Sequence, residues 1–168
     1  MEYHVTLPYP KIKVESKNIA YANLILLNFA GYTSELSAVT QYVYHQISFA
    51  DLYPQVSKII RGISEVEMHH MEILGELIVK LGSEPRYWIN NKKKNSYWSP
   101  TFLNYNTSLK QAIAVNIKDE KDAILQYKNT IKQIDDKNII DIINRIILDE
   151  EYHIQLLTNI YTNHVLKV

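Results

Sequence analysis

The chain has 168 residues, 46% of them hydrophobic and 21% charged, which is typical of one folded globular domain and not of a disordered segment. The formal net charge is zero and no basic run extends beyond Lys92–Lys94, so binding to nucleic acids or membrane surfaces is not expected. The absence of cysteine excludes disulfides, a thiol nucleophile and cysteine-bound zinc or iron–sulfur centres. Without a signal-peptide core or a long apolar run, a cytoplasmic location is expected.

The N-terminal half predicts an arm followed by two helices. Residues 1–15 are expected to form an extended arm, and residues 16–168 a single domain. A first helix is expected over residues 16–49, where apolar residues recur at spacings of three and four. A second helix is expected after Asp51, a candidate N-cap, with Pro54 in its first turn and its end at Gly82.

A long connection over about residues 83–106 interrupts the helical pattern. It contains two prolines, both tryptophans and several asparagines, and it is too long for a tight turn between helices. Further helices are expected over about residues 107–134 and 138–165, and no strand is predicted. The sequence therefore predicts an all-α four-helix bundle in which the long connection crosses the length of the bundle between the second and third helices.

Acidic residues and histidines interrupt the apolar stripe of each expected helix at one level. The second and fourth helices each carry a glutamate and a histidine three residues apart, which places both side chains on one face, about 60° apart. The first and third helices each carry a single glutamate on the stripe. The six candidate metal ligands are Glu35, Glu67, His70, Glu120, Glu150 and His153.

The two halves of the chain repeat this arrangement. Tyr42 follows Glu35 by seven residues, and Tyr127 follows Glu120 by the same interval. Two helical turns place each tyrosine on the face of its glutamate. The pattern indicates an internal duplication of a helix with Glu and Tyr and a helix with Glu-x-x-His. The two tyrosines are candidate catalytic residues beside the site, with simple packing in the core as the alternative.

Burying four carboxylates together requires positive charge. Like charges repel, and each carboxylate loses hydration worth several kcal/mol. No Lys or Arg shares these helix faces near the glutamates. Two divalent cations would balance the four negative charges, and two neutral imidazoles would complete a ligand set suited to iron or manganese, with zinc as a substitute. A lone Glu-x-x-His pair is more often a surface pair, but its repetition across four helices favours a two-metal site.

The motifs that carry this pattern resemble those of a known family. Glu35, "EMHH" at residues 67–70, Glu120 and "DEEYH" at residues 149–153 resemble the ferritin-like di-iron and di-manganese carboxylate proteins. Within that superfamily the chain is most similar to the rubrerythrin and bacterioferritin-like group, and more distantly to the manganese catalases. The resemblance covers the chain after about residue 15.

The resemblance implies roles for the individual ligands. Glu67 and Glu150 are expected to bridge two metals, the other two glutamates to be more peripheral, and each histidine to bind one metal. Asp149, which precedes Glu150, is expected to orient a histidine ligand from outside the metal shell. Val66 stands at the matching position of the second helix, so the equivalent bond to His153 is expected from the backbone or from water.

The chain also departs from the family pattern. Without cysteine it has no rubredoxin domain and hence no electron donor of its own. Rubrerythrins tend to carry an additional glutamate on the third helix, where this chain has Ala123. That difference counts against direct rubrerythrin peroxidase activity.

Two classes of function follow from the resemblance. The first is an oxidoreductase acting on hydrogen peroxide or dioxygen, either a peroxidase with an external electron donor or a manganese-catalase-like enzyme without one. An oxygenase would need an organic substrate pocket, about which the sequence is silent. The second class is a non-catalytic metal-binding or structural assembly protein whose metals stabilise the bundle. A homo-oligomer, with a dimer favoured, is expected from Tyr21, Tyr32 and Tyr44, although these side chains would equally pack against the arm or the crossover.

Overall fold

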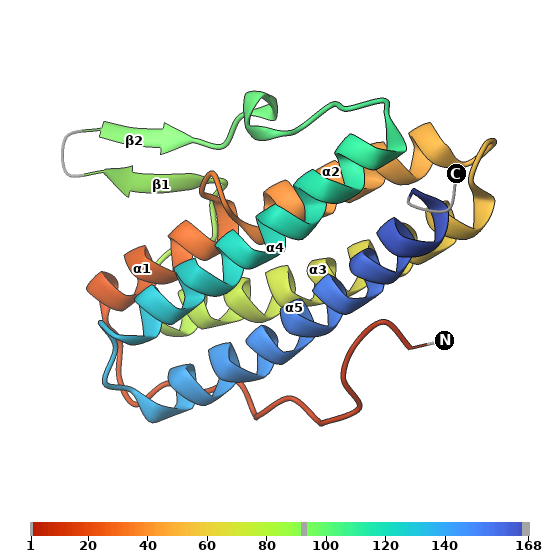
Figure 1. Ribbon diagram of the computed structural model, residues 1–168. Helices are drawn as coiled ribbons and strands as arrows, with labels where there is room; N and C mark the ends of the chain where they lie inside the picture. Colours follow the sequence, from red (N-terminus) through yellow and green to blue (C-terminus); the bar gives the residue numbers. More distant parts are fainter. Residues whose placement is uncertain (1, 92–93, 166–168) are drawn as a thin grey trace.

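A computed structural model describes residues 2–91 and 94–165, and in these ranges it has five α-helices and one short hairpin (Figure 1). The helices are α1 (Ile19–Ala30), α2 (Glu35–Phe49), α3 (Pro54–Lys80), α4 (Leu109–Ile131) and α5 (Lys137–His164). The hairpin strands are β1 (Trp88–Asn91) and β2 (Lys94–Tyr97), and a 3₁₀ turn follows at Pro100–Phe102. Helices α1 and α2 together form one side of a bundle whose other sides are α3, α4 and α5, which confirms the predicted four-helix architecture.

The prediction of one continuous helix over residues 16–49 is wrong, because the chain leaves the helix at residues 31–34. Gly31 has extended backbone (φ −77°, ψ −167°), and a Cβ atom there would lie 2.4 Å from the carbonyl oxygen of Leu27. Ser34 then caps α2 by accepting a hydrogen bond from the Ser37 N–H. As a result Glu35 lies in the first turn of α2, where the helix dipole favours a negative charge.

The boundaries of the remaining helices agree closely with prediction, except at the start of α3. Asp51 does not cap this helix: Tyr53 occupies the N-cap position without a side-chain bond, and Pro54 is the first helical residue. Proline there loses nothing, because the N–H it lacks has no partner within a helix. Helix α3 ends at Lys80, just before Gly82.

The prediction that the chain has no strand is wrong in the crossover, where β1 and β2 pair antiparallel with Trp88 opposite Tyr97. Aromatic side chains on a short hairpin favour this pairing. After the hairpin the chain runs back along the bundle to the start of α4, so the predicted crossing is confirmed (Figure 1). Lys92 and Lys93 lie outside the described residues.

Aromatic contacts hold the crossover against α2. The Trp98 Nε1–H donates to Ser37 Oγ at 2.9 Å. The rings of Tyr44 and Tyr105 meet edge to face with their centroids 4.9 Å apart. Tyr32, although 69% exposed, has its ring 5.3 Å from that of Phe102. Two of the tyrosines from which an oligomer was predicted therefore contact the crossover, and the dimer stays a prediction.

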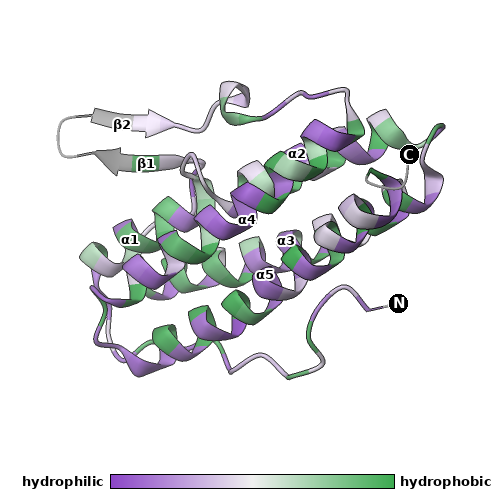
Figure 2. Ribbon diagram, in the orientation of Figure 1, coloured by the Kyte–Doolittle hydropathy of each residue, from purple (hydrophilic) through white to green (hydrophobic). Residues whose placement is uncertain are grey.

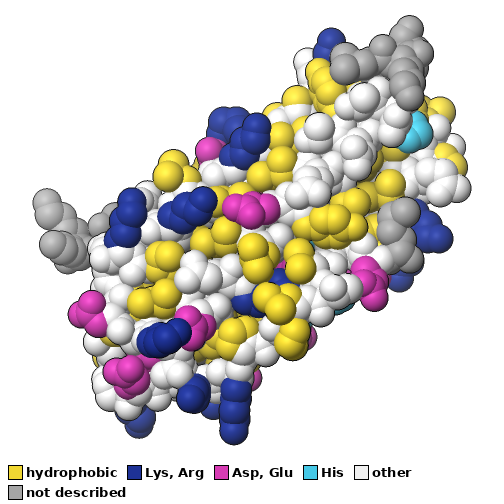
Figure 3. Space-filling view, turned by 60° about the horizontal axis from the view of Figure 1, so that its bottom comes forward, with side chains coloured by type: hydrophobic (Ala, Val, Ile, Leu, Met, Phe, Trp, Pro, Cys, Tyr) yellow, Lys and Arg dark blue, Asp and Glu magenta, His cyan; other side chains and the backbone are white. Residues whose placement is uncertain are grey.

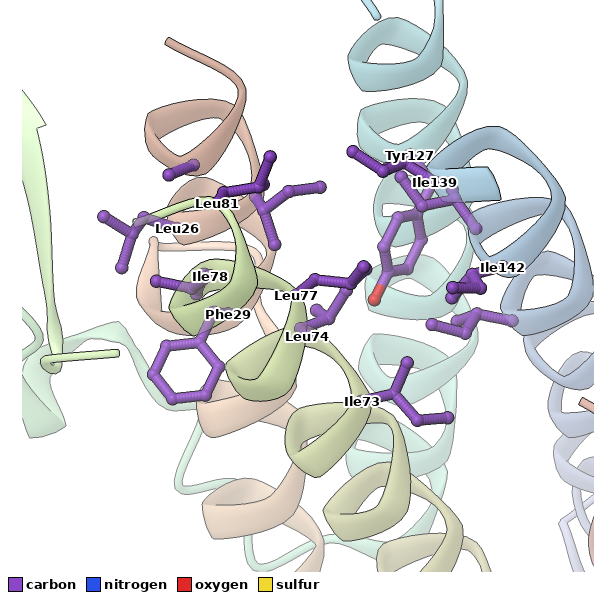
Figure 4. Packing of buried hydrophobic residues seen from close by; sticks show 14 of the residues in the cluster. Leu26, Phe29, Ile73, Leu74, Leu77, Ile78, Leu81, Tyr127, Ile139 and Ile142 are labelled. Atoms are coloured by element: carbon purple, nitrogen blue, oxygen red, sulfur yellow. The ribbon is translucent and has the colours of Figure 1, made fainter. Parts of the chain in front are cut away.

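Two apolar clusters fill the bundle, one toward each end, because polar residues interrupt the hydrophobic stripes of the long helices at one level. Figure 2 shows hydrophobic and hydrophilic residues alternating along these helices. The first cluster joins α1, the C-terminal half of α3, the end of α4 and the first half of α5 (Figure 4). The second joins the end of α2 with the first halves of α3 and α4 and the last turns of α5. On α3, the stretch between Ile63 and Ile73 belongs to the gap between the clusters, and Glu67 and His70 lie there.

Residues 2–18 contain neither helix nor strand and run along the bundle beside α5 (Figure 1). Buried Arg145 donates hydrogen bonds to the carbonyl oxygens of Val5 (2.6 Å) and Leu7 (2.7 Å). The Glu15 N–H donates to the Asp136 carboxylate at 2.6 Å. The arm is therefore fixed to α5 at both of its ends.

Charges on the surface are mixed. On the face shown in Figure 3, basic and acidic side chains are interspersed and form no large patch of one sign. This agrees with the zero net charge of the chain and gives no support for a nucleic-acid surface. Among the described residues, no helix is both long and apolar enough to span a bilayer.

Candidate metal centre

All six predicted ligands meet between the two apolar clusters, and all are buried. Their donor atoms form two groups, in each of which the atoms lie within 4.8 Å of one another. The first group comprises Glu35, Glu67, His70 and Glu150, and the second comprises Glu67, Glu120, Glu150 and His153. Two glutamates, one from each Glu-x-x-His helix, thus belong to both groups. Helices α2, α3, α4 and α5 all contribute at this one level.

Both histidine rings turn Nδ1 toward the glutamates. His70 Nδ1 lies 3.0 Å from Glu67 Oε2 and 3.3 Å from Glu150 Oε1. His153 Nδ1 lies 2.8 Å from Glu67 Oε1 and 3.2 Å from Glu150 Oε2. Nδ1 is therefore the candidate metal-binding atom of each ring, and Nε2 is left to carry the proton.

The Nε2 atoms face away from the glutamates and have different partners. His70 Nε2 lies 3.2 Å from Asp149 Oδ2 and 3.1 Å from the Tyr9 hydroxyl. His153 Nε2 lies 3.0 Å from the carbonyl oxygen of Tyr3. The structure thus places Asp149 of α5 against the histidine of α3, and gives the other histidine a backbone acceptor from the N-terminal arm. Such outer bonds fix the tautomer and orientation of a metal-binding imidazole.

Each of the two tyrosines forms a hydrogen bond with the glutamate from the other half of the chain. The sequence places each beside the glutamate of its own helix, but the Tyr42 hydroxyl donates to Glu120 and the Tyr127 hydroxyl donates to Glu35. Helical side chains lean toward the helix N-terminus, so each phenol reaches back to the level of the glutamates and across to the neighbouring helix. Burial raises the pKa of both phenols well above the usual value, so both keep their protons and act as donors.

Protons occupy the centre in the absence of metal. Burial, then the charges of Glu150 and Glu67, raise the pKa of Glu35 well above its usual value, and burial with the same two charges does so for Glu120. For His153, burial opposes protonation, but Glu67 and Glu150 outweigh it and raise the pKa to about 9. For Glu67, burial opposes ionisation, but the two histidines outweigh it and lower the pKa.

This donor set fits two divalent metal ions. Glu67 Oε1 and Glu150 Oε1 are buried carboxylate oxygens that each face a histidine Nδ1, at 2.8 Å and 3.3 Å respectively. When that Nδ1 carries no proton the oxygen has no donor, and a buried anionic oxygen without a donor is costly unless a cation satisfies it. Four carboxylates and two imidazoles are oxygen and nitrogen ligands of the kind that iron and manganese accept.

A buried arginine completes the surroundings of Asp149. Arg145 Nη1 lies 2.7 Å from Asp149 Oδ1, and the Val5 N–H donates to the same oxygen at 2.8 Å. Burial opposes ionisation of Asp149, but hydrogen bonds from His70, Tyr9, Val5 and Arg145 lower its pKa. Sequence reasoning missed Arg145, although a charged residue four positions before Asp149 within a run of isoleucines was a usable signal. Tyr9 left no such signal, because the arm has no periodicity.

A cavity of about 300 Å³ reaches the glutamates from the side of α2 and α4. All four glutamates and both tyrosines line it, whereas neither histidine does. Ala123 is part of its wall, and Tyr32 and Phe102 are among the lining residues nearer the surface. The centre is thus accessible on the glutamate side and covered by the N-terminal arm on the histidine side.

Two glutamines line this cavity and connect its walls through hydrogen bonds, and sequence reasoning missed both. Gln41 donates to Asp119 at 2.8 Å and accepts the Asn104 N–H of the crossover at 2.7 Å. Gln126 donates to the carbonyl oxygen of Thr33 at 2.6 Å, across the break between α1 and α2. Each glutamine directly precedes one of the paired tyrosines, so the duplicated motif extends to Gln-Tyr in both halves of the sequence.

Comparison with known proteins shows where this bundle fold recurs. The chain is 24% identical over 161 residues to a probable manganese catalase of Clostridium acetobutylicum, covering 85% of this chain and 71% of that protein. The crystal structure of a manganese catalase from Anabaena superposes with a TM-score of 0.83 at 23% identity, covering 96% of this chain and 80% of that one. These likenesses support the same bundle fold.

Bacterioferritins share the fold as well. The protein from Mycobacterium tuberculosis matches with a TM-score of 0.71 at 22% identity, over 86% of this chain and 85% of that one. The protein from Desulfovibrio desulfuricans, whose structure was described for its diiron site, matches with a TM-score of 0.73 at 20% identity, over 89% and 82%. The fold is therefore ferritin-like, as predicted. The family model named Rubrerythrin matches residues 26–161, a range that contains all six candidate ligands, and the chain belongs to that family.

Proposed function

We propose that this protein is a two-metal oxidoreductase that uses iron or manganese to react with hydrogen peroxide or dioxygen. Zinc would fit the same ligands, but it is redox-inactive and would not support this reaction. The observation that carries the proposal is the convergence of six buried donor side chains into two groups that share Glu67 and Glu150. Membership of the Rubrerythrin family and the likeness to a manganese catalase and to a bacterioferritin with a diiron site support it.

Each ligand has a role that follows from its position. His70 and His153 would each hold one metal through Nδ1, and Glu67 and Glu150 would bridge both. The remaining two glutamates would each bind one metal from the cavity side. Two bound metal ions would supply paired one-electron redox changes, so that an O–O bond receives two electrons in one event without release of a radical.

The protein itself controls access and protons. The cavity admits a small molecule to the glutamate side of the centre, while the apolar clusters at either end keep the surroundings dry. Tyr42 and Tyr127 line this cavity, and each hydroxyl keeps its proton. Tyr42 donates that proton in a hydrogen bond to Glu120, and Tyr127 donates its proton to Glu35. These phenols are positioned to orient the glutamates, and a hydroxyl that turns away from its glutamate would donate its proton to an oxygen species in the cavity instead.

Peroxide consumption by metal-loaded protein tests this function. Iron- or manganese-loaded protein is expected to consume hydrogen peroxide at least about tenfold faster than the same concentration of free metal. Activity without a reductant would indicate a catalase-like reaction, and activity only with one would indicate a peroxidase with an external electron donor. If neither loaded form exceeds free metal under either condition, the proposed reaction with hydrogen peroxide fails.

Narrowing the cavity is expected to slow this reaction without loss of metal. Ala123 lines the cavity one turn after Glu120, so Ala123→Leu would fill space beside the centre. We expect a several-fold lower rate of peroxide consumption with two metals still bound per chain. Ala114→Leu, at an exposed position of the same helix, is the matched control. Equal rates for both variants would show that peroxide reaches the metals by another route.

A further inference from the structure

We propose that residues 2–9 of the N-terminal arm form a strap that holds both metal-binding histidines in position, and that Gly62 of α3 is the seat of this strap. The inference rests on the proposed metal centre, because it concerns how the two histidines are kept ready to bind metal. The strap lies on the histidine side of the centre, opposite the cavity that reaches the glutamates.

The strap provides or supports the outer hydrogen bond of each histidine. The Tyr3 carbonyl accepts from His153 Nε2. For His70, the partner is Asp149, and the strap holds that carboxylate through the Val5 N–H and the Tyr9 hydroxyl. The same hydroxyl lies 3.1 Å from His70 Nε2 itself. These contacts join residues that are 61 to 150 positions apart in sequence, so only the folded strap makes them.

A buried cation anchors the strap to α5. The Arg145 guanidinium donates to the carbonyl oxygens of Val5 and Leu7, and its carbon atom Cζ lies 4.2 Å from the centre of the Tyr9 ring. The same guanidinium pairs with Asp149. One side chain thus ties the backbone of the strap to the carboxylate that orients His70, and both depend on it for their position.

The strap contacts α3 at a glycine, where the helix backbone has no side chain. Gly62 is buried in the first half of α3, and a Cβ atom there would lie 2.2 Å from Cδ2 and Cε2 of the Tyr3 ring. Glycine inside a helix costs roughly 0.5–1 kcal/mol relative to alanine, so helix formation alone disfavours it at this position. Its presence lets the Tyr3 ring lie directly on the helix backbone, which sets the Tyr3 carbonyl opposite His153.

Residues that act through such outer bonds are positioning residues, and their loss typically lowers metal affinity about 10–100-fold. We therefore expect Gly62→Ala to displace Tyr3 and to increase the rate at which manganese-loaded protein loses metal to an excess of chelator by about 10–100-fold. The measurement follows metal release directly and does not depend on turnover.

Gly75→Ala is the matched control on the same helix. A Cβ atom at Gly75 would meet the Phe29 ring at 3.5 Å, an ordinary contact, so this variant is expected to release metal as slowly as the wild type. The double variant Gly62→Ala/Tyr3→Ala removes the ring but keeps the carbonyl, so it is expected to restore slow release. Rescue of this kind would not follow if Gly62→Ala acted only by disturbing α3.

The outcomes separate the strap from the metal centre. Equal release rates for Gly62→Ala and Gly75→Ala in a wild type that binds two metals would overturn the strap alone. A wild type that does not bind two metals would overturn the proposed function. If Gly62→Ala lacks native helicity by circular dichroism, Tyr9→Phe replaces it, with Tyr105→Phe, whose hydroxyl donates to the Pro100 carbonyl oxygen at 3.0 Å in the crossover and away from the strap, as control. Faster release from Tyr9→Phe supports the strap, and equal release overturns it.

Discussion

Replacing both Glu67 and Glu150 with alanine is expected to abolish tight binding of metal to this protein. These two carboxylates are the members that the two donor groups share, so their removal takes two ligands from each metal at once. Loss of an outer hydrogen bond alone costs about 10–100-fold in metal affinity, and the loss of two direct ligands per metal is expected to cost more than that. Equilibrium titration with manganese or iron, followed by elemental analysis, measures the effect.

The matched control is the double variant Glu65→Ala/Glu72→Ala. Both residues lie on α3 within five positions of Glu67, and both are exposed. This variant removes the same number of acidic groups from the chain but leaves the buried centre intact, so it is expected to bind two metals like the wild type. A Glu67→Ala/Glu150→Ala protein that still binds two metals tightly would show that the ligand assignment is wrong.

Raising the pH from about 6 to 9 is expected to destabilise the metal-free protein. Folding raises the pKa of His153 from 6.5 to about 9, and it raises that of His70 as well. The stabilisation from a histidine with a raised pKa is complete below the unfolded pKa and is lost as the pH rises through the folded pKa. For His153 the loss is on the order of 3 kcal/mol.

The buried glutamates act in the same direction. Folding raises the pKa of Glu35 and Glu120. Above the pKa of the unfolded chain, the unfolded state loses these protons while the folded state still holds them, so the free energy of unfolding falls as the pH rises. The carboxyl groups of Glu67 and Asp149 have lowered pKa values, and the stability they contribute is lost only under acidic conditions. Denaturant unfolding of metal-free protein at several pH values between 6 and 9 is therefore expected to show falling stability.

Metal binding should reverse this trend. Metal ions displace the protons on the histidines and glutamates, so the apparent affinity should rise with pH and the loaded protein should lose less stability than the metal-free protein. A His153→Gln variant is expected to flatten the pH dependence of the metal-free protein, and the exposed His69→Gln is expected to leave it unchanged. Metal-free stability that rises between pH 6 and 9 would contradict the charge assignments.

Much of the fold was predictable because the buried residues of a helix recur in the sequence at spacings of three and four. The apolar stripes located the long helices, and the repeated Glu-x-x-His spacing picked out Glu67 and His70 from a crowded segment. Their neighbours Glu65, His69 and Glu72 are exposed, as the 100° step of the helix predicts. The apolar stripe is a less reliable guide at its edge, where apolar Met68, which directly follows Glu67, is 46% exposed.

The features that sequence reasoning missed depend on contacts between distant segments. The break at residues 31–34 was missed because α1 and α2 both direct apolar residues toward the core. The apolar pattern therefore continues in the sequence from one helix to the next. The cross-pairing of Tyr42 and Tyr127 depends on how α2 packs beside α4, which spacing within one helix does not encode. The extended arm has no periodicity, so its bonds to the two histidines became visible only in the folded chain.

Anomalous X-ray diffraction from crystals of manganese-loaded protein tests the central claim most directly, since it locates each metal and its ligands. The expected result is two anomalous peaks per chain between Glu67 and Glu150, one bound by His70 Nδ1 and the other by His153 Nδ1. A single peak at this site, or peaks bound only by residues outside the six candidates, would contradict the two-metal centre.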